Sequence, residues 1–167
     1  MFASCEISSS VMRETVIREK FPEISAAFCF WKNAKTITEN SESCRSRALA
    51  VFGHRQKIRA IIVIAEQIYS QGFATFKMRI RTEGIEFIQL LPFLGPATSY
   101  HLAKNIGLDV VKPDRHLIRV AAVAGYENPR ILCEEISKHV GDRISVVDLV
   151  IWRFATLNPH YTKYFVY

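Results

Sequence analysis

The residue best placed to do chemistry in this chain is Asp114, which directly follows Pro113. Apolar residues recur at helical spacing after it, so Asp114 is predicted to stand at the start of a helix. A carboxylate in that position can stabilise a developing positive charge or activate an attacking water molecule. It can also simply cap the helix that opens at Arg115. The two roles do not exclude each other.

A second chemical feature lies upstream, in the segment LPFLGPATS at 91–99. Its leucines are predicted to be pinned in the core, with Gly95 at a bend between two helices. Such a hairpin turns successive backbone N–H groups outward at the start of the next helix, where they bind phosphate without reading base sequence. The alternative is an ordinary helical corner. The predicted phosphate contacts are Leu94, Gly95, Ala97 and Thr98.

Together the two segments resemble motifs of the helix-hairpin-helix DNA glycosylases, the endonuclease III superfamily. The hairpin resembles LPGVGxxTA, and KPDRHLIRV at 112–120 resembles the segment V-D-x-H-[hydrophobic]-x-R-V that carries the family's catalytic aspartate. Asp114 follows Gly95 by 19 residues, close to the family's separation. Weaker likeness at 54–61 and 147–152 extends the resemblance to about 21–157.

The resemblance implies a compact, minimal version of the all-α glycosylase fold, with the helix-hairpin-helix at about 83–107. It implies an enzyme that flips a damaged or modified base out of double-stranded DNA. Asp114 would promote hydrolysis of the N-glycosidic bond of that base, either by stabilising charge on the deoxyribose or by activating water.

Departures from the family pattern narrow this expectation. Ala97 stands where bifunctional members carry a Schiff-base lysine, which predicts a monofunctional glycosylase, with a displaced Lys104 or Lys112 as the alternative. The four closely spaced cysteines of the family's iron–sulfur cluster are absent from the sequence, so no cluster or other metal is expected beyond a monovalent cation at the hairpin. His116 is expected to support the site rather than to perform the chemistry.

Contacts to DNA must also come from basic and insertable side chains. Basic residues near the start of the helix predicted over 54–71 form the candidate DNA-binding surface. The alternative is that they form only a solvent-exposed helix face. The members of this surface are Arg45, Arg47, Arg55, Lys57 and Arg59.

In the family a gap-filling residue follows the second helix, and its best counterpart is Asn33. Aromatic residues that could line a base pocket, or simply pack in the core, are Phe28, Phe30, Trp31 and Trp152.

Composition and charge are compatible with a DNA-binding protein. The 167 residues suit one domain, 1–167, and 22 Lys and Arg against 16 Asp and Glu give a net charge of +6. The four scattered cysteines show no metal-ligand spacing, and the N-terminus does not resemble a signal peptide, which favours a reducing cytoplasm. Charged residues break every apolar run, so we expect a soluble protein without membrane contact, and a monomer.

Periodicity predicts helices throughout. We expect one from Ser9 or Ser10 to about Lys20, another from Pro22, and a long connection over Thr36–Ser46, in which a serine could cap a short helix over 45–52. The remaining predicted helices are 54–71, 83–90, 97–106, 114–124, 129–140 and 145–157.

Two other functions remain open. A non-catalytic helix-hairpin-helix DNA-binding module would keep the hairpin and lose the chemistry. A helical interaction domain with no nucleic-acid role would make both motifs coincidental.

Overall fold

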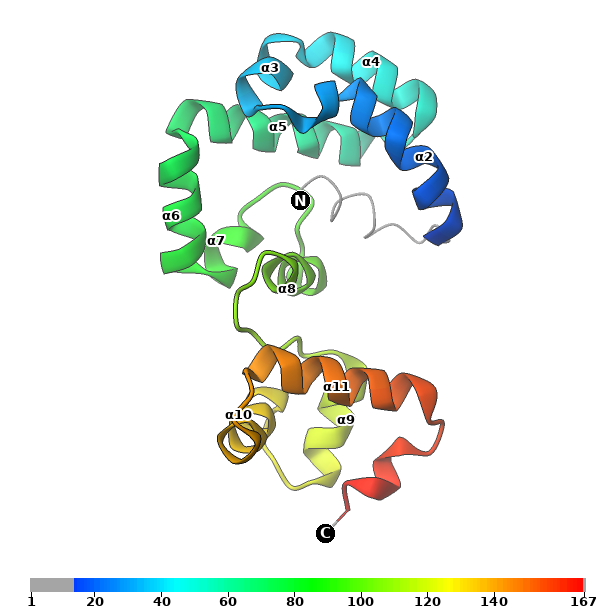
Figure 1. Cartoon of the computed structure of the whole chain (residues 1–167), viewed down its shortest axis with the longest axis vertical. Coiled ribbons are helices and arrows are strands. Elements are labelled where there is room, and N and C mark those ends of the chain that lie inside the picture. Colours follow the sequence, from blue (N-terminus) through cyan, green and yellow to red (C-terminus); the bar gives the residue numbers. More distant parts are fainter. Residues whose placement is uncertain (1–13, 167) are drawn as a thin grey trace. The chain divides into compact units, whose positions relative to one another are not determined.

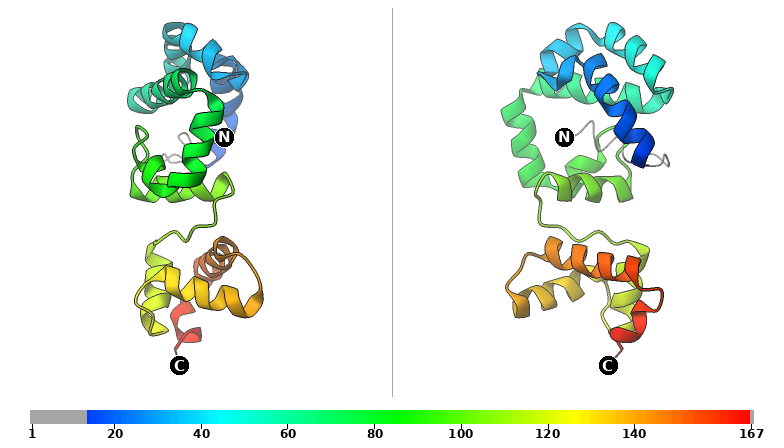
Figure 2. Two further views of the ribbon diagram at one scale, coloured as in Figure 1. Left: turned by 90° about the vertical axis from the view of Figure 1, so that its left-hand side faces the viewer. Right: turned by 45° about the vertical axis from the view of Figure 1, so that its right-hand side comes forward.

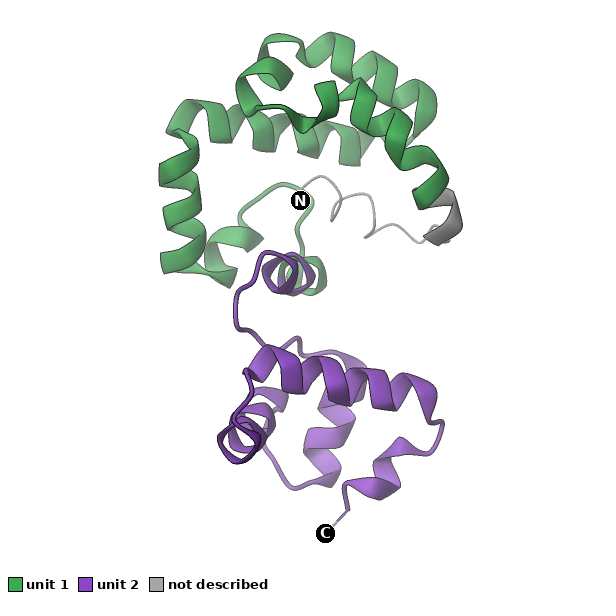
Figure 3. Cartoon of the chain, in the orientation of Figure 1, with its two compact units in different colours: residues 1–99 green, residues 100–167 purple. Residues whose placement is uncertain are grey.

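The computed structural model describes the backbone of residues 14–166 and the side chains of residues 18–166. These residues form helices and no strand, which confirms the all-α prediction (Figure 1). None of the helices in this range combines the length and apolar character needed to cross a membrane. The chain divides into two compact units, Met1–Ser99 and Tyr100–Tyr167, with the boundary inside helix α8 (Figure 3). The expectation of a single domain over 1–167 stays a prediction.

The first unit is built around the long helix α5, against which α3 and α4 pack (Figures 1 and 2). Its buried core contains Phe28, Ile58 and Ile61, and α2 contributes Ile24. Within the described range its elements are α2 (Glu14–Ala27), the 3-10 helix η1 (Cys29–Trp31), α3 (Ala34–Glu39), α4 (Ser41–Val51), α5 (Arg55–Gln71), α6 (Phe73–Glu83), α7 (Ile85–Gln89) and the start of α8 (Pro96–Asn105).

The sequence prediction holds best for α5. Ile58, Ile61, Ile62 and Ala65 are all buried, as their spacing of three and four residues predicts, and His54 caps the helix by accepting from the Lys57 N–H. Apolar side chains on one helical face must leave water together, which makes this periodicity a strong signal.

Two predictions in the N-terminal half are wrong. Residues 36–46 form α3 and most of α4 rather than a long connection, because Asn33 caps α3 and the exposed polar residues occupy the outer helix faces. Pro22 also lies inside α2 instead of starting a new helix. The predicted start at Ser9 or Ser10 lies outside the described residues.

The helix α6 has no counterpart in the predictions from sequence. Only Phe76 and Ile80 of this helix are buried, one turn apart, so its apolar stripe is too narrow to stand out. Phe76 meets Phe87 of α7 edge-on, with ring centroids 5.2 Å apart. Gly84 joins α6 to α7 at a φ of 59°, a conformation that favours glycine.

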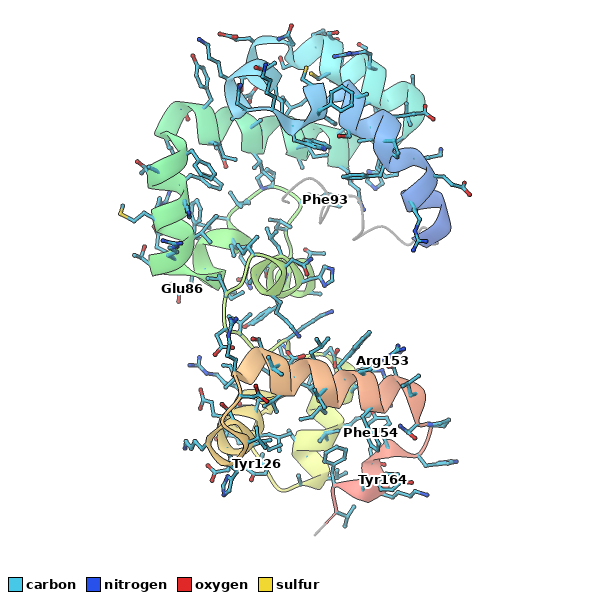
Figure 4. The ribbon with its side chains drawn as sticks, in the orientation of Figure 1. Glu86, Phe93, Tyr126, Arg153, Phe154 and Tyr164 are labelled. Carbon is cyan, nitrogen blue, oxygen red and sulfur yellow. The ribbon has the colours of Figure 1, made fainter. Side chains whose placement is uncertain are left out.

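In the second unit α11 packs against both α9 and α10, and η2 contacts α9 and α11 (Figure 1). Leu117, Val120, Leu132 and Ile151 lie in its buried core. Phe154 and Tyr164 meet edge-on beside this core, with ring centroids 5.5 Å apart (Figure 4). The elements are the rest of α8, α9 (Arg115–Val123), α10 (Pro129–Val140), α11 (Ile144–Leu157) and η2 (Tyr161–Tyr164). Apart from η2, which the sequence analysis does not assign, these helices match the prediction within one or two residues.

Candidate phosphate-binding hairpin and carboxylate site

The hairpin between α7 and α8 has the geometry that its sequence predicts. Leu91 and Leu94 are each 3% exposed, whereas Gly95 is exposed. The Ser99 N–H donates to the Gly95 carbonyl at 2.9 Å, and the Thr98 hydroxyl donates to the same oxygen at 3.1 Å. These two bonds fix the first turn of α8 directly on the bend.

Three backbone N–H groups at this bend are available to a ligand. Within the described part of the chain, the N–H groups of Gly95, Ala97 and Thr98 have no hydrogen-bond partner, as expected for the first turn of a helix. Leu94 is different, because its N–H donates to the Leu91 carbonyl at 3.2 Å. The prediction that the Leu94 amide binds phosphate is therefore corrected: this group closes the hairpin.

Phe93 gives the hairpin a feature that the sequence analysis missed. Its φ is 66°, a left-handed conformation that favours glycine, and in LPGVGxxTA a glycine stands at this position. The ring lies in the loop before α8 (Figure 4), where it meets the His54 ring edge-on at 5.4 Å and the Lys57 ammonium at 5.5 Å. The replacement of a motif glycine by phenylalanine is the sequence signal that could have indicated this left-handed residue.

The predicted basic surface is mostly engaged in internal contacts. Arg45 pairs with Glu42 at 2.6 Å, and Arg47 donates to the Ala27 carbonyl at 3.1 Å. Lys57 is only 2% exposed, so it does not lie on the surface on which the prediction placed it. Of the five candidates, Arg55 and Arg59 remain exposed on α5, and their side chains form no hydrogen bond or ion pair among residues 18–166.

Asn33 has a structural task in the first unit. Its side-chain oxygen accepts from the Thr36 N–H at 2.7 Å and from the Thr36 hydroxyl at 2.9 Å, so it caps α3. An inserted Asn33 would break both bonds. Its assignment as the gap-filling residue stays a prediction, and insertion into DNA would remove the cap of α3.

The four aromatic candidates do not share one environment. Phe28 is 0% exposed in the first core and stacks on Trp31 at 4.9 Å, so it is a core residue rather than the lining of an open pocket. The Trp31 indole N–H is buried without a partner in the described chain. Phe30 is 73% exposed, and Trp152 belongs to the second unit.

The turn that carries Phe30 has an unusual backbone. Cys29, Phe30 and Trp31 have φ values of 55°, 53° and 56°, which are all left-handed. A non-glycine residue pays roughly 1–2 kcal/mol for this conformation, so the surrounding contacts must hold the turn in place. Stacking of Trp31 on Phe28 provides one such contact, and the bond from the Trp31 N–H to the Phe28 carbonyl at 3.0 Å provides another.

Asp114 is the N-cap of α9. One carboxylate oxygen, Oδ1, accepts from the N–H groups of His116 at 2.9 Å and Leu117 at 3.1 Å. The other oxygen, Oδ2, accepts no hydrogen bond from any residue in 18–166. Asp114 is half-buried. One oxygen therefore orients the carboxylate while the second is left to act on a ligand or on water.

His116 lies beside this carboxylate in a supporting position. Its Nδ1 lies 3.2 Å from the Tyr161 hydroxyl, and the two rings are 5.4 Å apart. This contact fixes the start of α9 against η2. The arrangement agrees with the expected supporting role, and the absence of a chemical role for His116 stays a prediction.

Asp148 of α11 fixes the segment in front of Asp114. Its Oδ1 accepts from the Lys104 ammonium at 2.6 Å, and its Oδ2 accepts from the backbone N–H of Lys112 at 2.6 Å. The Asp148 side chain is 3% exposed. The ion pair occupies the Lys104 amine, one of the two alternatives for a displaced lyase lysine. Asp148 falls within the weak likeness at 147–152, which by itself predicts no role for this residue.

Cys133 of α10 is buried near Asp148. Burial raises the pKa of its thiol to about 12 from an ordinary value of 9.0, and the negative charge of Asp148 adds to the increase. Between these two values the unfolded chain loses the proton and the folded chain keeps it, so stability present below pH 9 is lost as pH rises.

This shift predicts a measurable alkaline effect. Between pH 8 and 10 the free energy of unfolding of the wild type should fall by about 1.4 kcal/mol more than that of Cys133→Ala. Urea denaturation at several pH values under reducing conditions would measure the difference. Parallel pH profiles for the two proteins would show that the native thiol titrates like an exposed one.

Searches with this chain found no matching protein-family model, no matching curated protein and no matching solved structure. Among residues 14–166 no group of three or more His, Cys, Asp or Glu side chains is placed to hold a metal ion. Functional inference therefore depends on the hairpin and the carboxylate themselves.

Proposed function

We propose that this protein is a monofunctional DNA base glycosylase. The proposal rests on the different surroundings of the two oxygens of the Asp114 carboxylate. Oδ1 accepts two hydrogen bonds from the start of α9, whereas Oδ2 has no partner in the described structure. A carboxylate oriented in this way suits the stabilisation of a positively charged sugar, which gains from a fixed negative group.

The hairpin supplies the second element of the proposal. The N–H groups of Gly95, Ala97 and Thr98 would bind a DNA phosphate, helped by the positive end of the α8 dipole. Neutral amides bind any phosphate of the backbone, which suits an enzyme that scans DNA for a rare base. A monovalent cation at the hairpin remains part of the proposal.

In the proposed reaction water adds to C1′ of the deoxyribose and the bond from C1′ to the base breaks. The base leaves with one proton, and the DNA retains an abasic site. Ala97 offers no amine to form a Schiff base, and Lys104 is paired with Asp148. Strand cleavage should therefore need a separate alkali step, with Lys112 as the remaining alternative for a displaced lyase lysine.

One observation favours the alternative of a non-catalytic DNA-binding module. Capping alone accounts for the two hydrogen bonds that Asp114 accepts. Such a module would bind DNA through the hairpin and release no base.

A panel of duplexes, each with one oxidised, alkylated, mismatched or hypermodified base, tests the proposal. We expect strand breaks at one class of base after alkali treatment and none before it. Breaks without alkali would contradict the monofunctional assignment. Breaks produced equally by an Asp114→Asn protein would contradict the catalytic assignment, and binding without base release on every duplex would favour the non-catalytic module.

A further inference from the structure

The exposed ring of Phe30 points to a nucleic-acid contact that the two motifs do not include. We propose that Phe30 stacks on a base next to a gap in the DNA stack. This inference deepens the proposed function and rests on it for the identity of the ligand. Phe30 would be a positioning residue, since it does not touch the reacting bond.

Phe30 stands out within its own turn. Its neighbours Cys29 and Trp31 pack against the first core, whereas Phe30 is 73% exposed. All three residues have left-handed φ values near 55°. Conformations of this kind persist only where packing over-determines them, and they cluster at functional sites.

The turn is also held firmly. Trp31 stacks on the fully buried Phe28 at 4.9 Å and on Phe21 at 6.4 Å. Arg47 donates to the Ala27 carbonyl at 3.1 Å, just before the turn, and the Lys32 N–H donates to the Cys29 carbonyl at 3.2 Å. Because the backbone of this turn is fixed, the ring of Phe30 would lose little conformational freedom on binding.

The surroundings of Phe30 favour a nucleic acid over a protein surface. Lys32 follows two residues later, is exposed and forms no ion pair within the described structure. An exposed aromatic ring two residues from an exposed cation suits a base and its phosphate, since stacking tolerates any base and the cation attracts the backbone. The net charge of +6 is of the right sign.

Asn33, the residue predicted from sequence to fill the gap, is less suited to this task. Its oxygen is engaged by Thr36 in two hydrogen bonds. Phe30 breaks no hydrogen bond when its ring enters a stack. Inserted apolar side chains are a common way for proteins to replace stacking that DNA has lost.

The test compares two duplexes of one sequence, one intact and one with a tetrahydrofuran abasic analogue, which no glycosylase can process. Binding by the full chain is measured for Phe30→Ala, for Phe30→Trp and for Phe73→Ala. Phe73 is a matched control because it is 64% exposed in the same unit but lies in an ordinary helix. Phe30→Gly also removes the ring, and it relaxes the left-handed backbone.

We expect Phe30→Ala and Phe30→Gly to weaken binding to the abasic duplex about tenfold, within the range for the loss of one stacked base, and to change binding to the intact duplex less than twofold. Phe30→Trp and Phe73→Ala should bind both duplexes as the wild type does. Equal losses on both duplexes, no loss on either, or no wild-type binding would overturn the inference. Because no base is released in this assay, its result is independent of the excision assay.

Discussion

Replacement of Asp114 with asparagine is expected to lower the rate of base release by at least about 100-fold and to leave the protein folded. Asparagine caps helices as well as aspartate does, so the hydrogen bonds to His116 and Leu117 should survive. The negative charge is lost, and removal of one preorganised electrostatic group costs roughly 10²–10³ in rate. Single-turnover kinetics on the duplex identified in the panel would measure this loss.

Cap and charge can be separated with further variants. Asp114→Ser should also keep α9 capped without the charge, whereas Asp114→Ala should lose both and cost about 1 kcal/mol of stability. Asn128→Ala is the matched control, because Asn128 caps α10 in the same way. Its Oδ1 accepts from the Arg130 N–H at 3.0 Å and from the Ile131 N–H at 3.1 Å. This variant should lose similar stability with no change in rate. A wild-type rate for Asp114→Asn would leave Asp114 as a cap alone.

Replacement of Asp148 with alanine should have the largest effect on stability, a loss of about 3–5 kcal/mol in the free energy of unfolding. The change leaves the Lys104 ammonium, on a side chain that is 19% exposed, without its carboxylate partner. It also leaves the Lys112 N–H without its acceptor. Chemical denaturation would measure the loss. If the variant does not fold, Asp148→Asn, which keeps one acceptor, should show a smaller loss of the same origin.

An exposed ion pair provides the contrast to Asp148. Arg130 and Glu134 lie 2.7 Å apart on α10, with side chains 74% and 40% exposed. Glu134→Gln should cost less than about 1 kcal/mol, because water solvates both charges in either state. Similar losses for Glu134→Gln and Asp148→Ala would show that burial does not strengthen the Asp148 network.

The sequence predicted α5, the hairpin and α9–α11 because each has a local signal. The isoleucines of α5 repeat on one face, Asp114 and Asn128 precede their helices, and Gly141 adopts the left-handed conformation that ends α10. Such signals depend on neighbours within one or two turns, so they can be read along the chain.

Other parts of the candidate site depend on contacts that are distant in sequence. Burial of Lys57 could not be read from its position in a basic helix, since Phe93 meets it from the hairpin. The role of Asp148 needed knowledge of where residues 104 and 112 lie. The left-handed turn at Cys29–Trp31 contains no glycine, so the usual marker of that conformation was missing.

The tie from Asp148 to the Lys112 N–H also has a consequence for the order of folding. Asp148 follows Lys112 by 36 residues and Lys104 by 44. During synthesis the hairpin can therefore close on its local contacts while the segment before Asp114 still lacks its anchor. Contacts of long sequence separation form late because more chain entropy must be lost to make them. A nascent chain that ends before α11 would contain the closed hairpin while the segment before Asp114 is still unanchored, so the candidate carboxylate site is completed after the candidate binding element.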